Sequence, residues 1–368
     1  MSTQEKGYIL KDLNEFTQLA DCKKPFLCCG KSFMKTDAFD FLSNKYDLTV
    51  WSTVRPNPRY EDMLAAAELY KKNSCDYIIG AGGGSVLDSA KMIKLLVTND
   101  AETALLKPMD DNDIGFFAIP TTSGTGSEAT RYSIFYVNDV EKHSITHSGF
   151  LPDLVLLDET FLKTVPPYQR RCTAMDALCH AIESYWNVKS TSQSKEYAEK
   201  AIRLFVQNKN GYIANESVAN RNMLLSSYFA GKAINITSTT SAHAMCYNIT
   251  INCHTAHGHS VAANLAEIWN YMNQNNSFVN DKRGREYVLK TLDELGVMLG
   301  AKNSAGGAAA FRALVDEFGL ESPMADEKLV QGFAAGVNVD RLLNNPTTLT
   351  SADVEEIYKR VFKLNGQI

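Results

Sequence analysis

Short apolar runs alternate with helical repeats along the first 160 residues of the chain. The apolar runs have the length of buried strands and cover residues 26–29, 48–51, 77–79, 116–119 and 154–157. Between several of them apolar residues recur every three or four positions, as at Met63, Ala67 and Tyr70. This order predicts a parallel sheet with helices on both faces, and such sheets bind ligands at the carboxyl ends of their strands.

The pattern changes after Pro166 and Pro167, where strand-like runs largely disappear. Long helical repeats dominate from there on, for example at 194–207, 285–298 and 351–362. We therefore predict two domains, an α/β domain over 1–163 and an all-helical domain over 164–368.

Composition narrows the class of protein. Of the 368 residues, 45% are hydrophobic and 21% charged, which is typical of a globular protein with a sizeable core. The net charge is −5, and no cluster of Lys and Arg indicates a nucleic-acid or membrane surface. The N-terminal stretch MSTQEKGYIL lacks a basic region followed by an apolar run, so we expect no secretory signal. We expect no membrane span, because no stretch approaches about 20 apolar residues. Eight scattered cysteines without a CxxC pair favour reduced thiols and a cytoplasmic location.

A glycine-rich segment, IIGAGGGSVLDSAK, follows one apolar run and opens a helical repeat. Its glycines are Gly80, Gly82, Gly83 and Gly84. They permit close backbone approach, and the amide groups at a helix start favour an anion such as a pyrophosphate. The spacing is neither GxGxxG nor a P-loop. A plain tight turn is the alternative, but it does not require the entropic cost of four glycines in five residues.

A second loop, AIPTTSGTGSEAT, follows the next apolar run. Thr121, Thr122, Ser123 and Ser127 offer hydroxyl groups to phosphate or ribose oxygens. Loops of Ser, Thr and Gly are common, so this composition alone does not indicate a phosphate or ribose site. The position of the loop, after a strand and in the same domain as the glycine-rich segment, is what favours such a site.

The histidines suggest a metal site. Four of the seven fall within seventeen residues, namely His243, His254, His257 and His259. Upstream, Asp176 and His180 lie four residues apart in a helical segment and therefore share a face. One carboxylate with three imidazoles suits Fe(II), Zn(II) or a similar divalent ion. A lone histidine is more often structural, but this grouping favours ligands.

These motifs together resemble the iron-containing (group III) alcohol dehydrogenase family over nearly the whole chain. GGGSVLDSAK resembles its GGGSxxDxAK turn, PTTSGTGSEAT its PTTxGTGSExT loop, LPDLVLLDETFLKTVPP its linking segment and MDALCHAIESY its DAxxHAxE helix. The resemblance implies a Rossmann-like dinucleotide-binding domain followed by an all-helical metal- and substrate-binding domain, the architecture shared with dehydroquinate synthase. A homodimer or higher homo-oligomer is also implied.

The resemblance also implies site residues. In the family, the Asp and His of that helix and two later histidines fourteen residues apart hold the metal, which here are Asp176, His180, His243 and His257. Fe(II) is the implied ion, with Zn(II) as the alternative. Asn57 in RPNP matches a residue near the cofactor, with a plain turn as the alternative. Further implied cofactor contacts are Gly83, Gly84, Ser85, Asp88, Thr121, Thr122, Ser127, Lys142 and Leu162.

The chain departs from the family pattern in two places. Many members carry another His four residues after the third ligand, where this chain has Tyr247, whose phenol can hydrogen-bond a substrate oxygen. Members that prefer NAD often have an Asp after the first strand, where this chain has Gly30, Lys31 and Ser32. Lys31 would attract a 2′-phosphate, so we expect NADP(H) over NAD(H), with an exposed structural Lys31 as the alternative.

The expected function is hydride transfer between a nicotinamide and a small aldehyde or alcohol. The HAMxY…HGH pattern is similar to members that reduce phosphonoacetaldehyde to 2-hydroxyethylphosphonate. Arg131 is one candidate cation for such a substrate, and a structural ion pair is the other interpretation. Alternatives are lactaldehyde or 4-hydroxybutyrate as substrate, a glycerol-dehydrogenase-like or dehydroquinate-synthase-like zinc enzyme, and a catalytically silent metal or nucleotide binder.

Overall fold

A parallel sheet forms the centre of the N-terminal unit. The computed structural model describes residues 6–139 and 141–364, and within them six parallel strands form one sheet. The strands lie in the order β1 (Tyr8–Leu10), β8 (Leu154–Leu156), β5 (Gly115–Pro120), β4 (Tyr77–Gly82), β2 (Pro25–Cys29) and β3 (Thr49–Trp51). Because neighbouring strands are parallel, the carboxyl ends of β2, β4 and β5 meet at one edge.

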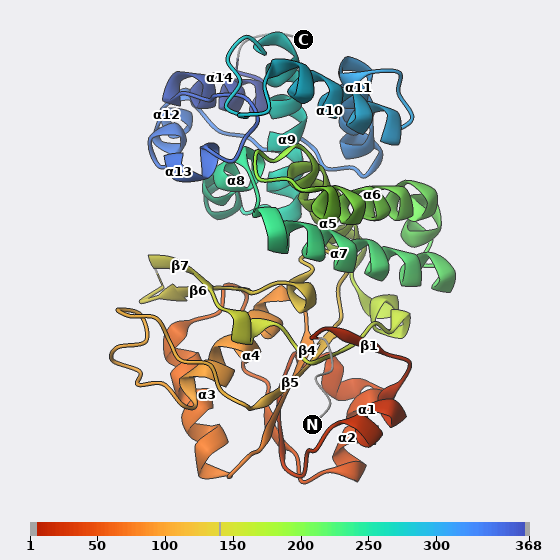
Figure 1. Cartoon of the computed structure of the whole chain (residues 1–368), viewed down its shortest axis with the longest axis vertical. Coiled ribbons are helices and arrows are strands. Elements are labelled where there is room, and N and C mark those ends of the chain that lie inside the picture. Colours follow the sequence, from red (N-terminus) through yellow and green to blue (C-terminus); the bar gives the residue numbers. More distant parts are fainter. Residues whose placement is uncertain (1–5, 140, 365–368) are drawn as a thin grey trace. The chain divides into compact units, whose positions relative to one another are not determined.

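Helices cover both faces of this sheet (Figure 1). On one face α3 (Tyr60–Lys72) and α4 (Gly84–Leu96) pack against Phe26 and Cys28 of β2. On the other face α1 (Leu13–Leu19) and α2 (Asp37–Lys45) pack against Leu27 and Cys29 of the same strand. Since successive side chains of a strand point to opposite faces, a strand covered on both sides is apolar at every position.

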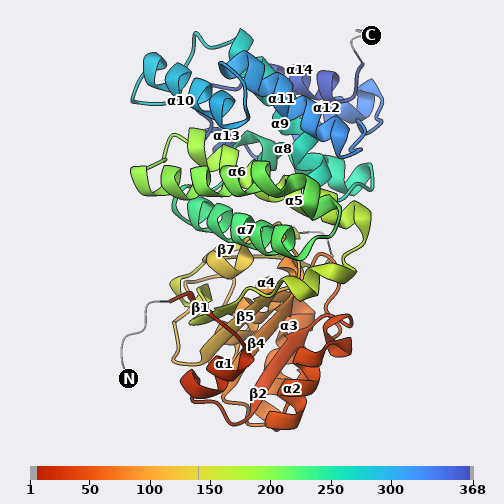
Figure 2. The same cartoon turned by 90° about the vertical axis from the view of Figure 1, so that its right-hand side faces the viewer.

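The C-terminal unit is built from helices. They are α5 (Pro167–Trp186), α6 (Ser192–Ile213), α7 (Ser217–Thr237), α8 (Ser241–Asn252), α9 (His257–Gln274), α10 (Arg285–Met298), α11 (Ser304–Glu317), α12 (Glu327–Ala335), α13 (Val339–Leu342) and α14 (Ser351–Val361). Helix α5 packs against α6, α7 and α9, and Figure 2 shows α5, α6 and α7 side by side. Fifteen of its twenty residues are buried, so α5 is the central helix of the unit.

The predicted fold class is confirmed by the parallel sheet and the helical second unit. The structure divides the chain into Met1–Thr164 and Val165–Ile368, one residue after the predicted boundary. Strand β1 and the antiparallel hairpin of β6 (Tyr132–Val137) and β7 (Glu141–Thr146) were not predicted from the sequence. No position of β7 is buried, so this strand carries no apolar pattern. None of the helices in the described ranges combines the length and apolarity needed to cross a bilayer.

We expect Gly258→Ala to lower the free energy of unfolding by about 1–3 kcal/mol, the usual cost of overpacking. A Cβ at Gly258 would lie 2.0 Å from the backbone oxygen of Cys172, so α9 must move away from α5. Gly332→Ala is the matched control, because nothing lies within 4 Å of a Cβ there and alanine favours the helix. Urea unfolding should show opposite signs for the two variants; a Gly258→Ala protein as stable as wild type would contradict this packing.

Candidate functional site

Helix α5 carries three ionisable side chains on one face. Asp176, His180 and Glu183 follow one another at intervals of four and three residues, which places them along one side of the helix. They are 3%, 6% and 0% exposed. Buried charged groups need partners of opposite charge or hydrogen bonds, so this face must be matched by groups from other helices.

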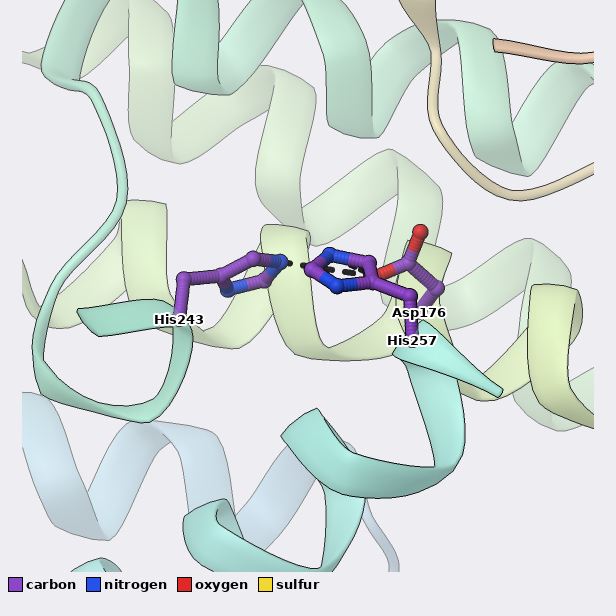
Figure 3. A group of neighbouring side chains, drawn as sticks. All are labelled: Asp176, His243 and His257. Atoms are coloured by element: carbon purple, nitrogen blue, oxygen red, sulfur yellow. Dashed lines mark ion pairs between the residues drawn. The ribbon is translucent and has the colours of Figure 1, made fainter. Parts of the chain in front are cut away.

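Two histidines from other helices meet Asp176. Its Oδ1 lies 3.4 Å from Nε2 of His243 in α8 and 3.8 Å from Nε2 of His257, the first residue of α9 (Figure 3). One potential ligand atom from each residue lies within 4.8 Å of the others. The ring of His180 stacks on that of His243 with centroids 4.4 Å apart. The structure thus brings the four predicted ligands together, three in a tight group and His180 against His243.

The chemistry of this group fits a divalent metal. Within the described residues, Asp176 Oδ1 and His243 Nε2 are buried atoms that make no hydrogen bond. Leaving a buried polar atom without a partner costs free energy, and a cation bound between these two atoms would give both of them a partner. Burial favours the neutral acid, but the neighbouring imidazoles, His180 foremost, hold the pKa of Asp176 well below its usual range. The site therefore offers an ionised carboxylate beside imidazole nitrogens, a donor set that Zn(II) and Fe(II) accept.

Glu183 positions His243. One carboxylate oxygen of Glu183 contacts Nδ1 of His243, which leaves Nε2 directed toward Asp176. Burial lowers the pKa of His243, but Glu183 and Asp176 outweigh it and raise that pKa to about 9. Metal binding at Nε2 must therefore displace a proton.

The other oxygen of Glu183 caps helix α8. It accepts hydrogen bonds from the backbone N–H of Thr240 (3.1 Å), the hydroxyl of Thr240 (2.7 Å) and the backbone N–H of Ala242 (2.9 Å). One carboxylate thus fixes both the ring of His243 and the helix that carries it. Glu183 received no role from the sequence alone, although its position seven residues after Asp176 and its place in the DAxxHAxE motif were available signals.

One side of the cluster is open to solvent. The side chain of His257 is 40% exposed, against 4% for those of Asp176 and His243. The ring of Tyr247 stacks on His257 with centroids 6.0 Å apart, and its hydroxyl accepts a 2.8 Å hydrogen bond from Arg341. Tyr247 thus lies beside the cluster, and its expected contact with a substrate oxygen stays a prediction.

The two remaining histidines of the sequence cluster lie outside the tight group. His254 is exposed, with a positive φ of 52°. His259 is 7% exposed and has both ring nitrogens engaged, Nδ1 with the hydroxyl of Tyr168 and Nε2 with the backbone oxygen of Glu321. The resemblance to the family likewise assigned the metal to His180, His243 and His257 and not to these two histidines.

The glycine turn joins β4 directly to α4. Its backbone is tied to the neighbouring loops, because the N–H of Thr121 donates to the oxygen of Gly82 and that of Gly30 to the oxygen of Ala81. A Cβ at Gly84 would lie 2.7 Å from Cγ2 of Thr125, so close packing of the two loops requires glycine there. No side chain in the described chain caps the start of α4, which leaves backbone amides there to bind an anion.

Several predicted cofactor residues follow the carboxyl ends of β2, β4 and β5. Thr121, Thr122 and residues 83–85 are half-buried, Lys31 and Ser32 are exposed after β2, and Gly30 is half-buried.

The other predicted contacts lie elsewhere in the N-terminal unit. Asn57 is exposed in a left-handed turn with φ 58°. Lys142 is half-buried in β7, and Leu162 is fully buried in the 3-10 helix Glu159–Thr164. The predicted anion contact Arg131 is exposed immediately before β6.

Asp88 and Ser127 belong to a buried network. The hydroxyl of Ser127 donates to Asp88 Oδ1 (2.6 Å) and accepts from Nζ of Lys91 (2.7 Å). The second Asp88 oxygen accepts the backbone N–H of Ile134 (3.0 Å). Lys91 is fully buried, and burial lowers its pKa to about 8 although Asp88 and Glu128 oppose this. These contacts of Asp88 and Ser127 tie the glycine turn to the Ser/Thr loop, and their direct cofactor contacts stay a prediction.

We expect Glu183→Gln to weaken the affinity for Zn(II) or Fe(II) by about 10- to 100-fold, the usual effect of removing a group that orients a ligand. The amide keeps the shape but loses the charge that fixes His243. Chelator competition measures the dissociation constant. Glu317→Gln is the control, because Glu317 forms an exposed ion pair with Lys209. A folded Glu183→Gln protein with wild-type affinity would exclude the positioning role.

Comparison with known proteins shows which family the sequence matches. The model for iron-containing alcohol dehydrogenase matches residues 4–159, and that for the Fe-containing alcohol dehydrogenase family, C-terminal, matches residues 171–362. Long-chain-alcohol dehydrogenase 1 of Geobacillus thermodenitrificans is 30% identical over 341 residues, covering 86% of this chain and 82% of the relative. The probable alcohol dehydrogenase EutG of Salmonella typhimurium is 31% identical over 328 residues, covering 84% and 79%.

Solved structures show the same architecture. A sulfoacetaldehyde reductase from Bifidobacterium kashiwanohense in complex with NAD+ matches with a TM-score of 0.85 at 25% identity, covering 97% of both chains. An iron-containing alcohol dehydrogenase from Thermotoga maritima matches with a TM-score of 0.82 at 25% identity and the same coverage. The matching models, relatives and structures span both units, and this chain belongs to the iron-containing alcohol dehydrogenase family.

Proposed function

We propose that this protein is a metal-dependent NAD(P)(H) oxidoreductase that interconverts a short aldehyde and its alcohol by hydride transfer. The observation that carries the proposal is the group of Asp176, His243 and His257, in which a buried, ionised carboxylate faces two imidazole nitrogens. Membership in the family supports the same reaction.

Each part of the reaction has candidate residues in this chain. A divalent metal held by Asp176, His180, His243 and His257 would supply Lewis-acid polarisation of the carbonyl oxygen. The exposed side of His257 admits the aldehyde, and Tyr247, whose ring stacks on His257, offers its hydroxyl to a substrate oxygen. The cofactor would supply the hydride, with its pyrophosphate at the start of α4.

We infer Fe(II) as the metal from the family, with Zn(II) as an ion that the same donors accept. We further infer NADP(H) as the preferred cofactor. The exposed Lys31 follows β2 directly after Gly30, and no carboxylate occupies positions 30–32 to repel a 2′-phosphate. The sulfoacetaldehyde reductase from Bifidobacterium kashiwanohense was solved with NAD+, so both cofactors must be compared directly.

The proposed substrate is a small aldehyde such as phosphonoacetaldehyde. The similar structure of a sulfoacetaldehyde reductase supports a two-carbon aldehyde with an anionic head. We also infer a homodimer or larger homo-oligomer, on the resemblance to the family.

Replacing a ligand should remove metal and activity together. We expect Asp176→Ala and His257→Ala each to lower bound metal well below one ion per chain and to reduce kcat/KM at least 100-fold. The exposed His254 is the matched control, since His254→Ala should keep full metal content. Elemental analysis after dialysis, with rates on the same samples, makes the test. Full metal and activity in Asp176→Ala would show that the ion binds elsewhere.

Initial rates of aldehyde reduction test the cofactor and substrate together. The Fe(II)- or Zn(II)-loaded protein is assayed with NADPH and with NADH on phosphonoacetaldehyde, sulfoacetaldehyde, lactaldehyde and butyraldehyde. We expect a higher kcat/KM with NADPH, and Lys31→Gln should shift the ratio toward NADH. A strong preference for NADH in the wild type would refute the interpretation of Lys31. No turnover by the loaded protein with any aldehyde would refute the proposed function.

A further inference from the structure

A cationic side chain lies next to the solvent-open side of the cluster formed by Asp176, His243 and His257. Arg341 belongs to the short helix α13 and is half-buried. One of its guanidinium nitrogens donates a 2.8 Å hydrogen bond to the hydroxyl of Tyr247, and its Cζ lies 5.5 Å from the centroid of that ring. The ring of Tyr247 stacks in turn on His257. A single aromatic side chain therefore connects the guanidinium to the cluster.

The charge of Arg341 is not balanced within the described residues, where no carboxylate forms an ion pair with it. Arg283 of the same unit is a useful contrast. Its guanidinium donates to both carboxylate oxygens of Asp281, to the backbone oxygens of Ser190 and Asn187, and to the hydroxyls of Ser190 and Tyr287. The guanidinium of Arg283 is therefore engaged in holding the fold. Among the described residues, the guanidinium of Arg341 makes one hydrogen bond, to a neutral phenol, although it carries five N–H donors.

A half-buried guanidinium of this kind suits an anion. Its planar arrangement of N–H groups matches the oxygens of a carboxylate, phosphonate or sulfonate, and the partner charge offsets the cost of keeping the cation out of water. The Tyr247 hydroxyl holds the guanidinium in place beside the cluster. Arg131, the candidate from the sequence, lies in the other unit and is exposed.

We propose that Arg341, oriented by Tyr247, binds the anionic head of the substrate and so selects short aldehydes that carry a phosphonate, sulfonate or carboxylate group. This inference rests on the proposed function, because it assigns the aldehyde carbonyl to the side of the cluster at His257. It predicts that selectivity for anionic aldehydes depends on helix α13, which contributes no metal ligand.

The test compares anionic and neutral aldehydes of similar size. The kcat/KM of the metal-loaded enzyme is measured for phosphonoacetaldehyde, sulfoacetaldehyde and succinic semialdehyde, each relative to butyraldehyde. Arg341→Gln should lower the ratio for the preferred anion by roughly 10- to 100-fold, the range expected for a charged hydrogen-bond partner. Arg341→Lys should recover part of this loss, and Tyr247→Phe should lower the ratio less than Arg341→Gln. The three anionic substrates show which head group is preferred.

Arg203→Gln is the matched control, because Arg203 is an exposed arginine of α6 paired with Glu199. It should leave every ratio unchanged. Equal anionic-to-neutral ratios in wild type and Arg341→Gln, with both proteins folded by circular dichroism, would overturn the inference while leaving the aldehyde reductase function intact.

A binding measurement separates this inference from the proposed function. Calorimetric titration of the metal-loaded protein with ethylphosphonate, and in parallel with ethylsulfonate and propionate, needs no turnover. Binding by the wild type that is at least tenfold weaker in Arg341→Gln, and unchanged in Arg203→Gln, would support the anion site even if no aldehyde were reduced. Equal binding by wild type and Arg341→Gln, or no binding by the wild type, would overturn it.

Discussion

The stability of the helical unit depends on charge and hydrogen-bond partners for two carboxylates that are buried inside it. Asp176 and Glu183 on α5 are both almost completely buried, a position that an isolated charge does not tolerate. Glu183 is compensated by His243 and by the N–H groups at the start of α8. Asp176 is faced by His243 and His257. The packing of α8 and α9 against α5 therefore serves both stability and ligand geometry.

This arrangement gives the cluster two different sides. On the closed side, Glu183 fixes the ring of His243, so one ligand direction is set before any metal binds. On the open side, His257 is partly exposed, Tyr247 stacks on its ring, and Arg341 donates a hydrogen bond to the Tyr247 hydroxyl. A rigid closed side suits metal retention, whereas a polar, cationic open side suits recognition of a small charged substrate.

Sequence patterns predicted those features of the fold and the site that depend on residues close together in the sequence. Continuous apolar runs indicated doubly covered strands, and the spacing of Asp176 and His180 indicated a shared helix face. Glu183 was missed because its role depends on the start of α8, some sixty residues later. Arg341 was missed because a lone arginine in a four-residue helix has no pattern of its own. Asp88 and Ser127 match family motifs, but their buried network becomes visible only when the two loops are folded together.

We propose that one divalent ion binds between Asp176, His180, His243 and His257. Anomalous diffraction from crystals of the Zn(II)- or Fe(II)-loaded protein, collected at the absorption edge of the metal, tests it most directly. We expect a single strong peak about 2.0–2.2 Å from a carboxylate oxygen of Asp176 and from one nitrogen of each histidine. A fully occupied peak elsewhere, or none at this cluster in loaded crystals, would contradict it.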